Sequence, residues 1–534
     1  MPPRRFLLFT ALASSSVAVY VGLSALGGTI GFPLDDAWIH QTYARSLAES
    51  GQLAYVPGQP SAGSTSPLWT LLVAAGYKLN IDYRLWTYAL GALSLALCAA
   101  CVERLSLRLQ PDRPRLAFAA ALLCLFEWHL AWAAASGMET VLFAALALAL
   151  IERTARPGVR PRDAAIFGAL GGLLTVTRPE GLLLIGLAGA VALLEAVRRA
   201  MRREVHFPAE SAKPGEPGWH SASRLQPTSR FQPGVSTPGA SGVLISVLSF
   251  ALFVFPAAWI NLQASGTLFP NTFYAKQQEY AVYFSSLAAW LPRALDVLTA
   301  PFVGAQVLLM PGFLLEAATS LRRLRDRATW PFVLPLAWIA AHLAVYALRL
   351  PVTYQHGRYL MPILPAIVLI GLHGSAKALE SIRRARRQGM PLAFLRRAAL
   401  GSLIALVAAF WIVGAGAYRI DVNIIERELV ASARWIETNT PPDALIAAHD
   451  IGAMGYFAHR PLLDLAGLIS PEVIPIIRDE AALRTLLRVR RADYLAAPPG
   501  FYTTLLDAPE LERVFSGDSP FAPEHWLVFR AIWE

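Results

Sequence analysis

The chain has 534 residues, of which 55% are hydrophobic and only 16% are charged, and its mean hydropathy is +0.44. Soluble globular proteins usually carry about a quarter charged residues, so this composition excludes an ordinary soluble protein. The net charge of +10 would suit a nucleic-acid-binding protein, but the arginines are divided among short loops instead of forming one basic surface. We therefore expect no nucleic-acid partner.

Apolar stretches near the roughly 18 residues needed to cross a bilayer recur through the first 420 residues. Several are shorter than this, and we interpret residues 67–79 as a short interfacial or re-entrant segment. The sequence predicts an all-α polytopic membrane domain over residues 1–419, with about 11–13 transmembrane helices. The expected spans are residues 6–26, 85–102, 115–135, 138–151, 163–177, 180–197, 242–262, 300–318, 330–348, 359–376 and 398–418.

Arginine clusters in alternate loops indicate the topology. The positive-inside rule assigns such loops to the cytoplasm, so we predict a multi-pass protein of a bacterial inner (cell) membrane. The intervening loops, and everything after residue 419, then lie on the extracytoplasmic side. The clusters lie within residues 104–115, 153–162, 198–203, 322–327 and 383–397.

Two regions outside the spans differ in composition from the rest. Residues 204–241 are rich in Pro, Ser and Gly and bury too little apolar surface to order, so we predict a disordered cytoplasmic loop. Residues 420–534 begin with a predicted amphipathic helix and continue into alternating helix and strand, which predicts a small extracytoplasmic α/β domain. The predicted elements are a helix at 421–438 and strands at 444–448, 494–497 and 526–532.

The first extracytoplasmic loop contains two adjacent carboxylates, Asp35 and Asp36, in the stretch GFPLDDAWIH at residues 31–40. Apolar residues recur at four-residue spacing from Ile39 until Gly51 ends the pattern, which predicts an amphipathic helix. We expect this helix to lie on the membrane surface, with both carboxylates at its N-terminus near the lipid headgroups. Adjacent carboxylates repel, so at least one needs a cation, a donor or a proton. The alternative is a helix N-cap with a solvated neighbour.

Further ionisable residues emerge on the same predicted face of the membrane. Ionisable groups at membrane depth cost about 2.5–3.5 kcal/mol each, so a set of them indicates a site. Each one singly could instead be a snorkelling charge or a helix cap, and the two in the C-terminal domain could equally be loop caps. The candidate substrate-binding residues are His40, Glu139, Arg178, Glu180, Lys276, His356, Arg358, Tyr359, His449 and Asp450.

Seven motifs in order resemble the GT-C superfamily of membrane glycosyltransferases. The resemblance is greatest to the bacterial group related to the terminal arabinofuranosyltransferase of the mycobacterial cell wall, and it covers most of the chain apart from residues 204–241. Single motifs of this kind are weak, whereas seven in order are specific. They are DDA at 35–37, AGSTSPLW at 62–69, SGMET at 136–140, TRPEG at 177–181, PNTFYAK at 270–276, GRYL at 357–360 and HDIGAMGYF at 449–457.

This resemblance implies a polyprenyl-phosphate sugar donor, an extracytoplasmic active site and inverting transfer to a glycan, lipid or protein acceptor of the cell envelope. In a single displacement, a carboxylate takes the proton of the acceptor hydroxyl, and either Asp35 or Asp36 could be this base. Arg178, Lys276 and Arg358 are candidates to stabilise the leaving phosphate. A divalent cation held by the two aspartates could assist, although no metal-ligand spacing requires one.

The competing function is a transporter or flippase for a lipid-linked sugar. Such a protein would also need intramembrane charges and a lateral opening for lipid. It would not need paired carboxylates beside a surface helix, or a C-terminal domain able to hold an acceptor. The sequence does not identify the donor sugar or the acceptor.

Overall fold

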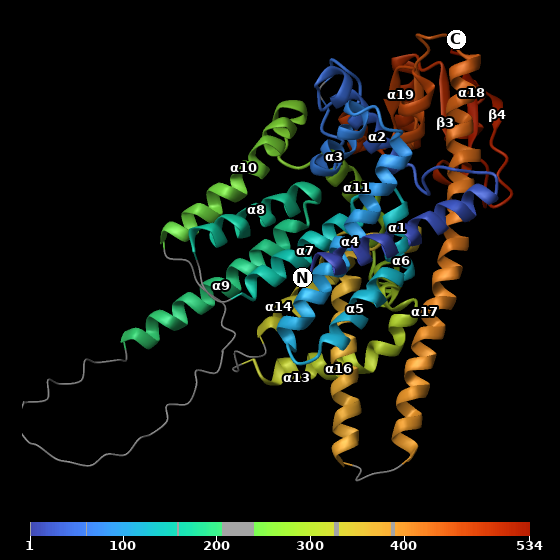
Figure 1. The fold of residues 1–534 in the computed structure, drawn as a ribbon. Coiled ribbons are helices and arrows are strands. Elements are labelled where there is room, and N and C mark those ends of the chain that lie inside the picture. The colour runs from blue at the N-terminus through green and yellow to red at the C-terminus, as the bar shows by residue number, and fades with distance from the viewer. Residues whose placement is uncertain are drawn as a thin grey trace, which may run out of the picture.

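The computed structural model describes residues 2–59, 61–156, 160–204, 240–324, 330–385 and 390–533. These residues fold mainly into α-helices, followed by a small sheet domain near the C-terminus (Figure 1). The predicted fold class, a helical membrane domain followed by a small α/β domain, is confirmed. Most of the stretch predicted to be a disordered loop, residues 205–239, lies outside the described residues.

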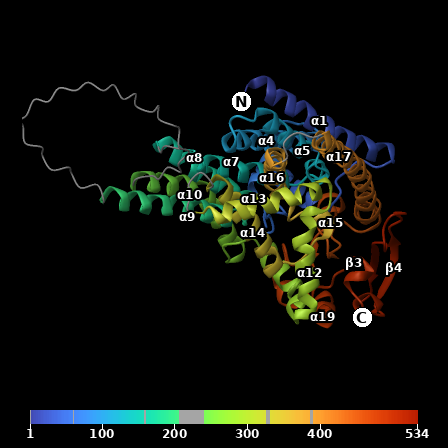
Figure 2. The same cartoon turned by 90° about the horizontal axis from the view of Figure 1, so that it is seen from below.

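The helical part of the chain runs from α1 to α17. Its helices are α1 (Pro3–Leu26), α2 (Asp36–Ser50), α3 (Pro67–Lys78), α4 (Tyr83–Leu109), α5 (Pro114–Phe126), α6 (Trp128–Ala135), α7 (Thr140–Thr154), α8 (Pro161–Thr177), α9 (Gly181–Glu204), α10 (Ala240–Ser265), α11 (Asn271–Glu279), α12 (Leu287–Thr299), α13 (Met310–Arg322), α14 (Trp330–Arg349), α15 (Tyr354–Gly357), α16 (Leu364–Ala385) and α17 (Met390–Ile424). Both views place α8–α10 on the opposite side of the molecule from the sheet domain (Figures 1 and 2).

Six helices within the described residues are long and apolar enough to cross a membrane, or up to eight if each of two strongly bent pairs forms one span. Shorter helices account for the difference from the predicted 11–13. Helices α7 and α8 have 15 and 17 residues, so at about 1.5 Å per residue they are shorter than a hydrocarbon core of about 30 Å. Helix α3 has only 12 residues, in keeping with its interpretation as a short segment.

Helix α17 does not stop where the membrane domain was expected to end. It continues through the π-helix Ile425–Val430 into α18 (Ala431–Asn439), so the proposed boundary at residue 419 lies inside one continuous helical rod. The buried Glu428 on this rod accepts the backbone N–H groups of Ser519 and Trp526, each at 2.7 Å. These bonds fasten the sheet domain directly to the long helix.

The sheet domain has five strands in the order β2-β1-β3-β5-β4. Strands β1, β2 and β3 are parallel, whereas β5 is antiparallel to β3 and β4. Three strands were predicted; β2 was missed because it is only three residues long, and β4 because its side chains are partly or fully exposed. The elements are β1 (Ile446–Ala448), β2 (Leu462–Asp464), α19 (Glu480–Arg490), β3 (Tyr494–Ala497), β4 (Leu511–Ser516) and β5 (Leu527–Ala531).

Helix α2 forms as predicted, and Gly51 ends it with a left-handed φ of 74°. Its expected placement on the membrane surface with one free face is wrong, because ten of its 15 residues are buried. It packs against α3 and against the π-helix Met454–Ala458 of the sheet domain. The indole of Trp38 lies 4.7 Å from the Phe457 ring and 5.1 Å from the Tyr456 ring, measured between ring centroids. Leu47, on the predicted apolar face, packs against Trp69 and Val73 of α3, whereas the sheet domain covers the neighbouring side of α2 at Trp38, so both sides are buried inside the protein.

Candidate active site

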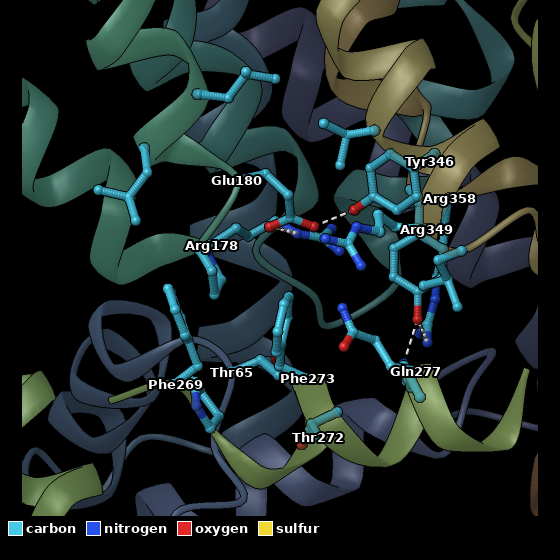
Figure 3. A pocket seen from close by; sticks show the side chains of 18 of the residues that line it. Thr65, Arg178, Glu180, Phe269, Thr272, Phe273, Gln277, Tyr346, Arg349 and Arg358 are labelled. Carbon is cyan, nitrogen blue, oxygen red and sulfur yellow. Dashed lines mark hydrogen bonds and ion pairs between the residues drawn. The ribbon is translucent and has the colours of Figure 1, made fainter. Parts of the chain in front are cut away.

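The helical domain contains a cavity of about 280 Å³ (Figure 3). The N-terminus of α2, the start of α7 and the α8–α9 turn contribute to its lining. The other contributions come from α11, the end of α14 and the segment before α16. The cavity gathers seven of the predicted site residues, although their positions in the sequence are separated by up to 323 residues. Those lining it are Asp36, Glu139, Arg178, Glu180, Lys276, Arg358 and Tyr359.

The cavity is lined by both charged and apolar side chains. Arg178, Arg349 and Arg358 lie on one side, and Figure 3 shows them facing Phe269 and Phe273 across the space. Further apolar side chains in the lining are Leu182, Leu183, Val345 and Leu350. A ligand with an anionic head and an apolar chain would match this combination of charged and apolar groups.

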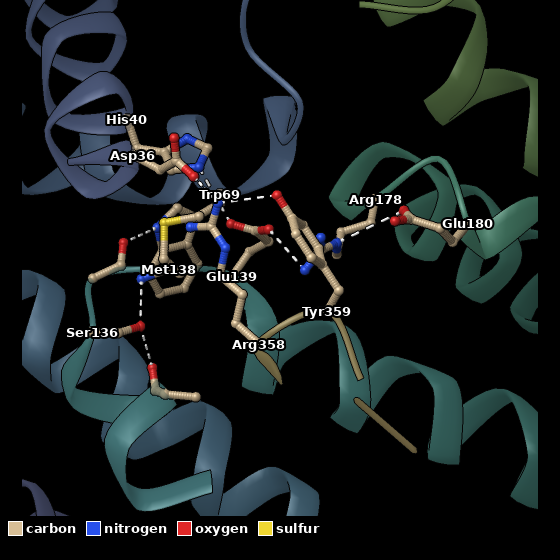
Figure 4. Close-up of polar contacts among 12 residues, drawn as sticks. Asp36, His40, Trp69, Ser136, Met138, Glu139, Arg178, Glu180, Arg358 and Tyr359 are labelled. Atoms are coloured by element: carbon tan, nitrogen blue, oxygen red, sulfur yellow. Dashed lines mark hydrogen bonds and ion pairs between the residues drawn. The ribbon is translucent and has the colours of Figure 1, made fainter. Parts of the chain in front are cut away.

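Asp36 is held at the cavity lining by Arg358. The Arg358 Nη2 donates to the Asp36 carboxylate and also to the Tyr359 hydroxyl, the latter at 3.0 Å (Figure 4). Lys276 donates to the same hydroxyl. Burial opposes ionisation of Asp36, but the charges of Arg358 and Lys276 outweigh it and hold the pKa of this carboxyl below its usual range. Asp36 is therefore an anion at neutral pH.

Three cations surround the ring of Tyr359. The guanidinium carbons of Arg178 and Arg358 lie 5.1 and 4.9 Å from its centroid, and the Lys276 ammonium lies at 5.0 Å. Cation–π attraction offsets part of the repulsion between these groups. The aromatic ring thus keeps three positive charges together beside one cavity.

Glu139 and Glu180 extend this network. His40 Nε2 lies 3.3 Å from one Glu139 oxygen, and Arg178 lies 3.6 Å from the other. Arg178 also lies 3.8 Å from Glu180, which accepts the hydroxyl of Tyr346. His40 is buried behind Glu139 and does not line the cavity.

A tight turn presents Arg358 to the cavity. Gln355, His356 and Gly357 have φ values of 52°, 60° and 69°, a left-handed conformation that is unfavourable for the two non-glycine residues. His356 Nε2 lies 2.7 Å from the carboxylate of Asp421 on α17, which anchors the turn. The predicted site residue His356 thus lies outside the cavity, where its contact fixes the backbone next to Arg358.

Asp35 occupies a different environment from Asp36. It is only 7% exposed, and its two carboxylate oxygens accept the backbone N–H groups of Gly452 and Ala453 at 2.6 and 2.7 Å. Although it stands at the N-cap position of α2, it makes no capping bond to that helix. Burial outweighs these hydrogen bonds and, with the charge of Asp36, raises the pKa of Asp35 to about 7. Asp35 joins α2 to the sheet domain and does not line the cavity.

The raised pKa of Asp35 should make stability depend on pH. The folded protein binds this proton more tightly than the unfolded chain, where an aspartate has a pKa of about 3.9. Its stabilising contribution is therefore complete below about pH 4 and lost as pH rises through about 7. We expect melting temperatures at about pH 5.5 and about pH 8 to differ more in the wild type than in Asp35→Asn, which cannot titrate.

Asp493→Asn is the matched control, because Asp493 also accepts a backbone N–H, that of Leu445 at 2.7 Å, but at an exposed position. Scanning fluorimetry in detergent would measure all three proteins. If the melting temperature changes equally with pH in the wild type and in Asp35→Asn, the raised pKa of Asp35 is contradicted.

His449 and Asp450 lie in the sheet domain away from the cavity lining. His449 Nδ1 lies 3.1 Å from the Tyr502 hydroxyl, and its ring packs at a tilt of 35° against Phe501, with 3.9 Å between ring centroids. Burial and the charge of Arg478 lower the pKa of His449 to about 4, so it is neutral at pH 7. Burial and the charges of Asp35 and Asp36 raise the pKa of Asp450 well above its usual value.

Sequence reasoning missed Arg349 and the polar residues Thr65, Thr272 and Gln277 of the cavity lining. Arg349 is the basic residue that ends the apolar run of α14, and this position could have identified it as a candidate from the sequence. Among the described residues, no group of three or more His, Cys, Asp or Glu side chains could hold a metal ion.

The fold is similar to that of solved glycosyltransferases. ArnT from Cupriavidus metallidurans, solved bound to undecaprenyl phosphate, gives a TM-score of 0.58 at 14% identity, covering 100% of this chain and 99% of that chain. The archaeal oligosaccharyltransferase AglB from Archaeoglobus fulgidus, solved with an inhibitory peptide and a dolichol-phosphate, gives 0.52 at 12% identity, covering 92% and 69%. Both neighbours are GT-C superfamily glycosyltransferases. The chain therefore has a GT-C fold.

Within the chain, a family model described as a domain of unknown function (DUF8728) matches residues 419–532. No curated protein matches the sequence. The neighbours and the candidate spans make the chain a multi-pass membrane protein.

Proposed function

We propose that this protein is an inverting glycosyltransferase that transfers a sugar from a polyprenyl-phosphate donor to a hydroxyl group of an extracytoplasmic acceptor. The main support for this proposal is the hydrogen bonding of the Arg358 side chain. Its side chain is only 5% exposed, and it holds Asp36 through one nitrogen. Its other two nitrogens, Nε and Nη1, are buried and have no hydrogen-bond partner among the described residues.

Buried N–H groups of this kind cost about 1–3 kcal/mol each when they remain unpaired. A phosphate group supplies the geometry and charge that a guanidinium binds most strongly. Lys276, Arg178 and Arg349 line the same cavity, and its apolar lining residues suit an isoprenoid chain. The polyprenyl or dolichyl phosphates bound to the two structural neighbours support this assignment.

The proposed reaction is a single displacement. The acceptor hydroxyl oxygen attacks the anomeric carbon of the donor sugar, while the bond from that carbon to the phosphate oxygen breaks. The electron pair of the broken bond stays on the phosphate, whose charge Arg358 and Lys276 stabilise. The hydroxyl proton passes to the carboxylate of Asp36, which then releases it to solvent. The products are the glycosylated acceptor and the polyprenyl phosphate.

A transfer assay in detergent tests this proposal directly. Purified protein is incubated with radiolabelled polyprenyl-phosphate sugars and envelope extracts, and label in the acceptor fraction is measured. We expect label to move from lipid to acceptor without any membrane present. Binding of the lipid with no chemical change in any combination would instead indicate a transporter or flippase, which needs two membrane faces but breaks no bond.

The seven motifs further support membership of the group related to the mycobacterial arabinofuranosyltransferase, and they leave the sugar itself open. Placement in a bacterial inner membrane with the C-terminal domain outside rests on the arginine clusters. We expect reporter fusions after Arg203 to report cytoplasm and fusions after Asp450 to report the extracytoplasmic side. Paired alkaline phosphatase and fluorescent-protein fusions at each position would measure this. A cytoplasmic reading after Asp450 would contradict the proposed location of the active site.

A further inference from the structure

A second cavity of about 420 Å³ lies between the helical domain and the sheet domain. The end of α11 and the polar side of α12 contribute Glu279, Tyr280 and Arg293 to its lining. The sheet domain contributes Arg478, Phe501 and Glu524. Arg478 Nε donates to the backbone carbonyl of Glu279 at 2.7 Å, which joins the two sides.

This second cavity adjoins the first one. Tyr354 lines the second cavity, and its hydroxyl lies 3.1 Å from that of Tyr359, which lines the first. Helix α11 and the residue after it serve both cavities, with Lys276 in the first and Tyr280 in the second. The charge of Asp36 also acts on Glu279. The second cavity therefore lies next to the one that contains the proposed base, with the Tyr354–Tyr359 contact between them.

The two linings differ in the chemistry that they offer. The first has more cations than carboxylates, whereas the second has more carboxylates than arginines. Aromatic side chains make up much of the second lining, and they include Tyr283, whose ring carries the Arg293 guanidinium at 3.7 Å, and Tyr280, whose ring stacks on Tyr354 at 6.2 Å. A volume of about 420 Å³ lies within the roughly 300–1,000 Å³ typical of small-ligand sites.

We propose that the second cavity binds the acceptor of the reaction, and that the part it holds is a neutral glycan. The C–H faces of sugar rings pack on aromatic rings such as Phe501 and Tyr280, while carboxylates such as Glu524 accept sugar hydroxyls. An anionic ligand would meet the carboxylates, and a lipid chain would meet too many charges. This inference rests on the proposed function, because it names the acceptor that receives the sugar.

Binding of neutral oligosaccharides to the full-length protein tests the inference. The wild-type protein in detergent is screened on an array of neutral oligosaccharides, and dissociation constants are then measured for the strongest binder. We expect Phe501→Ala and Glu524→Gln each to weaken that binding by about tenfold, because each removes a contact to one sugar ring. Binding of undecaprenyl phosphate, measured in parallel, should stay within about twofold of the wild type.

Two variants of the same domain are the matched controls. Phe521→Ala removes a ring that is 42% exposed, close to the 40% of Phe501, and Glu512→Gln neutralises an exposed carboxylate on β4; neither residue lines the cavity. Both should bind glycan as the wild type does. If the wild type binds undecaprenyl phosphate but no neutral glycan, or binds a peptide array instead, the inference is wrong while the proposed function stands. If undecaprenyl phosphate also fails to bind, the proposed function is wrong as well.

Discussion

Replacing Asp36 by asparagine is expected to lower the turnover of sugar transfer by at least about 10²-fold while leaving the affinity for polyprenyl phosphate unchanged or higher. Asparagine keeps the shape of the side chain but cannot take the proton of the acceptor hydroxyl. It also removes the negative charge that Arg358 now pairs with, so a phosphate would find a less neutralised guanidinium. Single-turnover transfer of a radiolabelled sugar, together with a separate lipid-binding titration, would measure both quantities.

Asp35→Asn is the informative control, since it makes the same chemical change one residue away. Asp35 binds two backbone N–H groups of the sheet domain and does not line the cavity, so its loss should act mainly on stability. We expect the Asp35 variant to keep clearly more turnover than the Asp36 variant when the amounts of folded protein are matched. Turnover near the wild-type value in Asp36→Asn would reject Asp36 as the base.

Replacing Arg358 by alanine is expected to weaken binding of undecaprenyl phosphate by at least about tenfold. The phosphate would lose charge-assisted hydrogen bonds that are each worth about 1.5–3 kcal/mol. The variant should also unfold at a somewhat lower temperature, because Asp36, which is partly buried in the cavity wall, loses its ion-pair partner. Lys276 still offsets part of the negative charge of Asp36, so the decrease in unfolding temperature should be moderate.

The variants Arg358→Lys and Arg427→Ala separate the effect on lipid binding from the effect on stability. Lysine keeps the charge but cannot offer the planar fork of donors, so the Arg358→Lys variant should recover stability better than it recovers lipid affinity. Arg427 forms an exposed ion pair with Asp518, and its loss should change neither quantity measurably. If the Arg358→Ala protein is folded and binds the lipid with wild-type affinity, the phosphate does not bind at Arg358.

The sequence by itself determined the features that depend on local pattern. Long apolar runs are sufficient to predict α1, α4 and α10, because a helix of that composition is stable only in a bilayer or a large core. Four-residue spacing and Gly51 predicted α2 to its final turn. The strands predicted at residues 444–448, 494–497 and 526–532 correspond to β1, β3 and β5, whereas the short strand β2 and the exposed edge strand β4 were not predicted.

Only the tertiary structure separated Asp35 from Asp36. The two share one local sequence, yet the partners that distinguish them, Gly452 and Arg358, lie more than 300 residues away along the chain. Gly452 itself is required by this contact, since a Cβ atom there would lie 2.1 Å from the backbone oxygen of Asp35. The burial of α2, which the pattern alone placed on a membrane surface, has the same origin. A periodic pattern shows that a helix has an apolar face, but what covers that face depends on packing between distant segments of the chain.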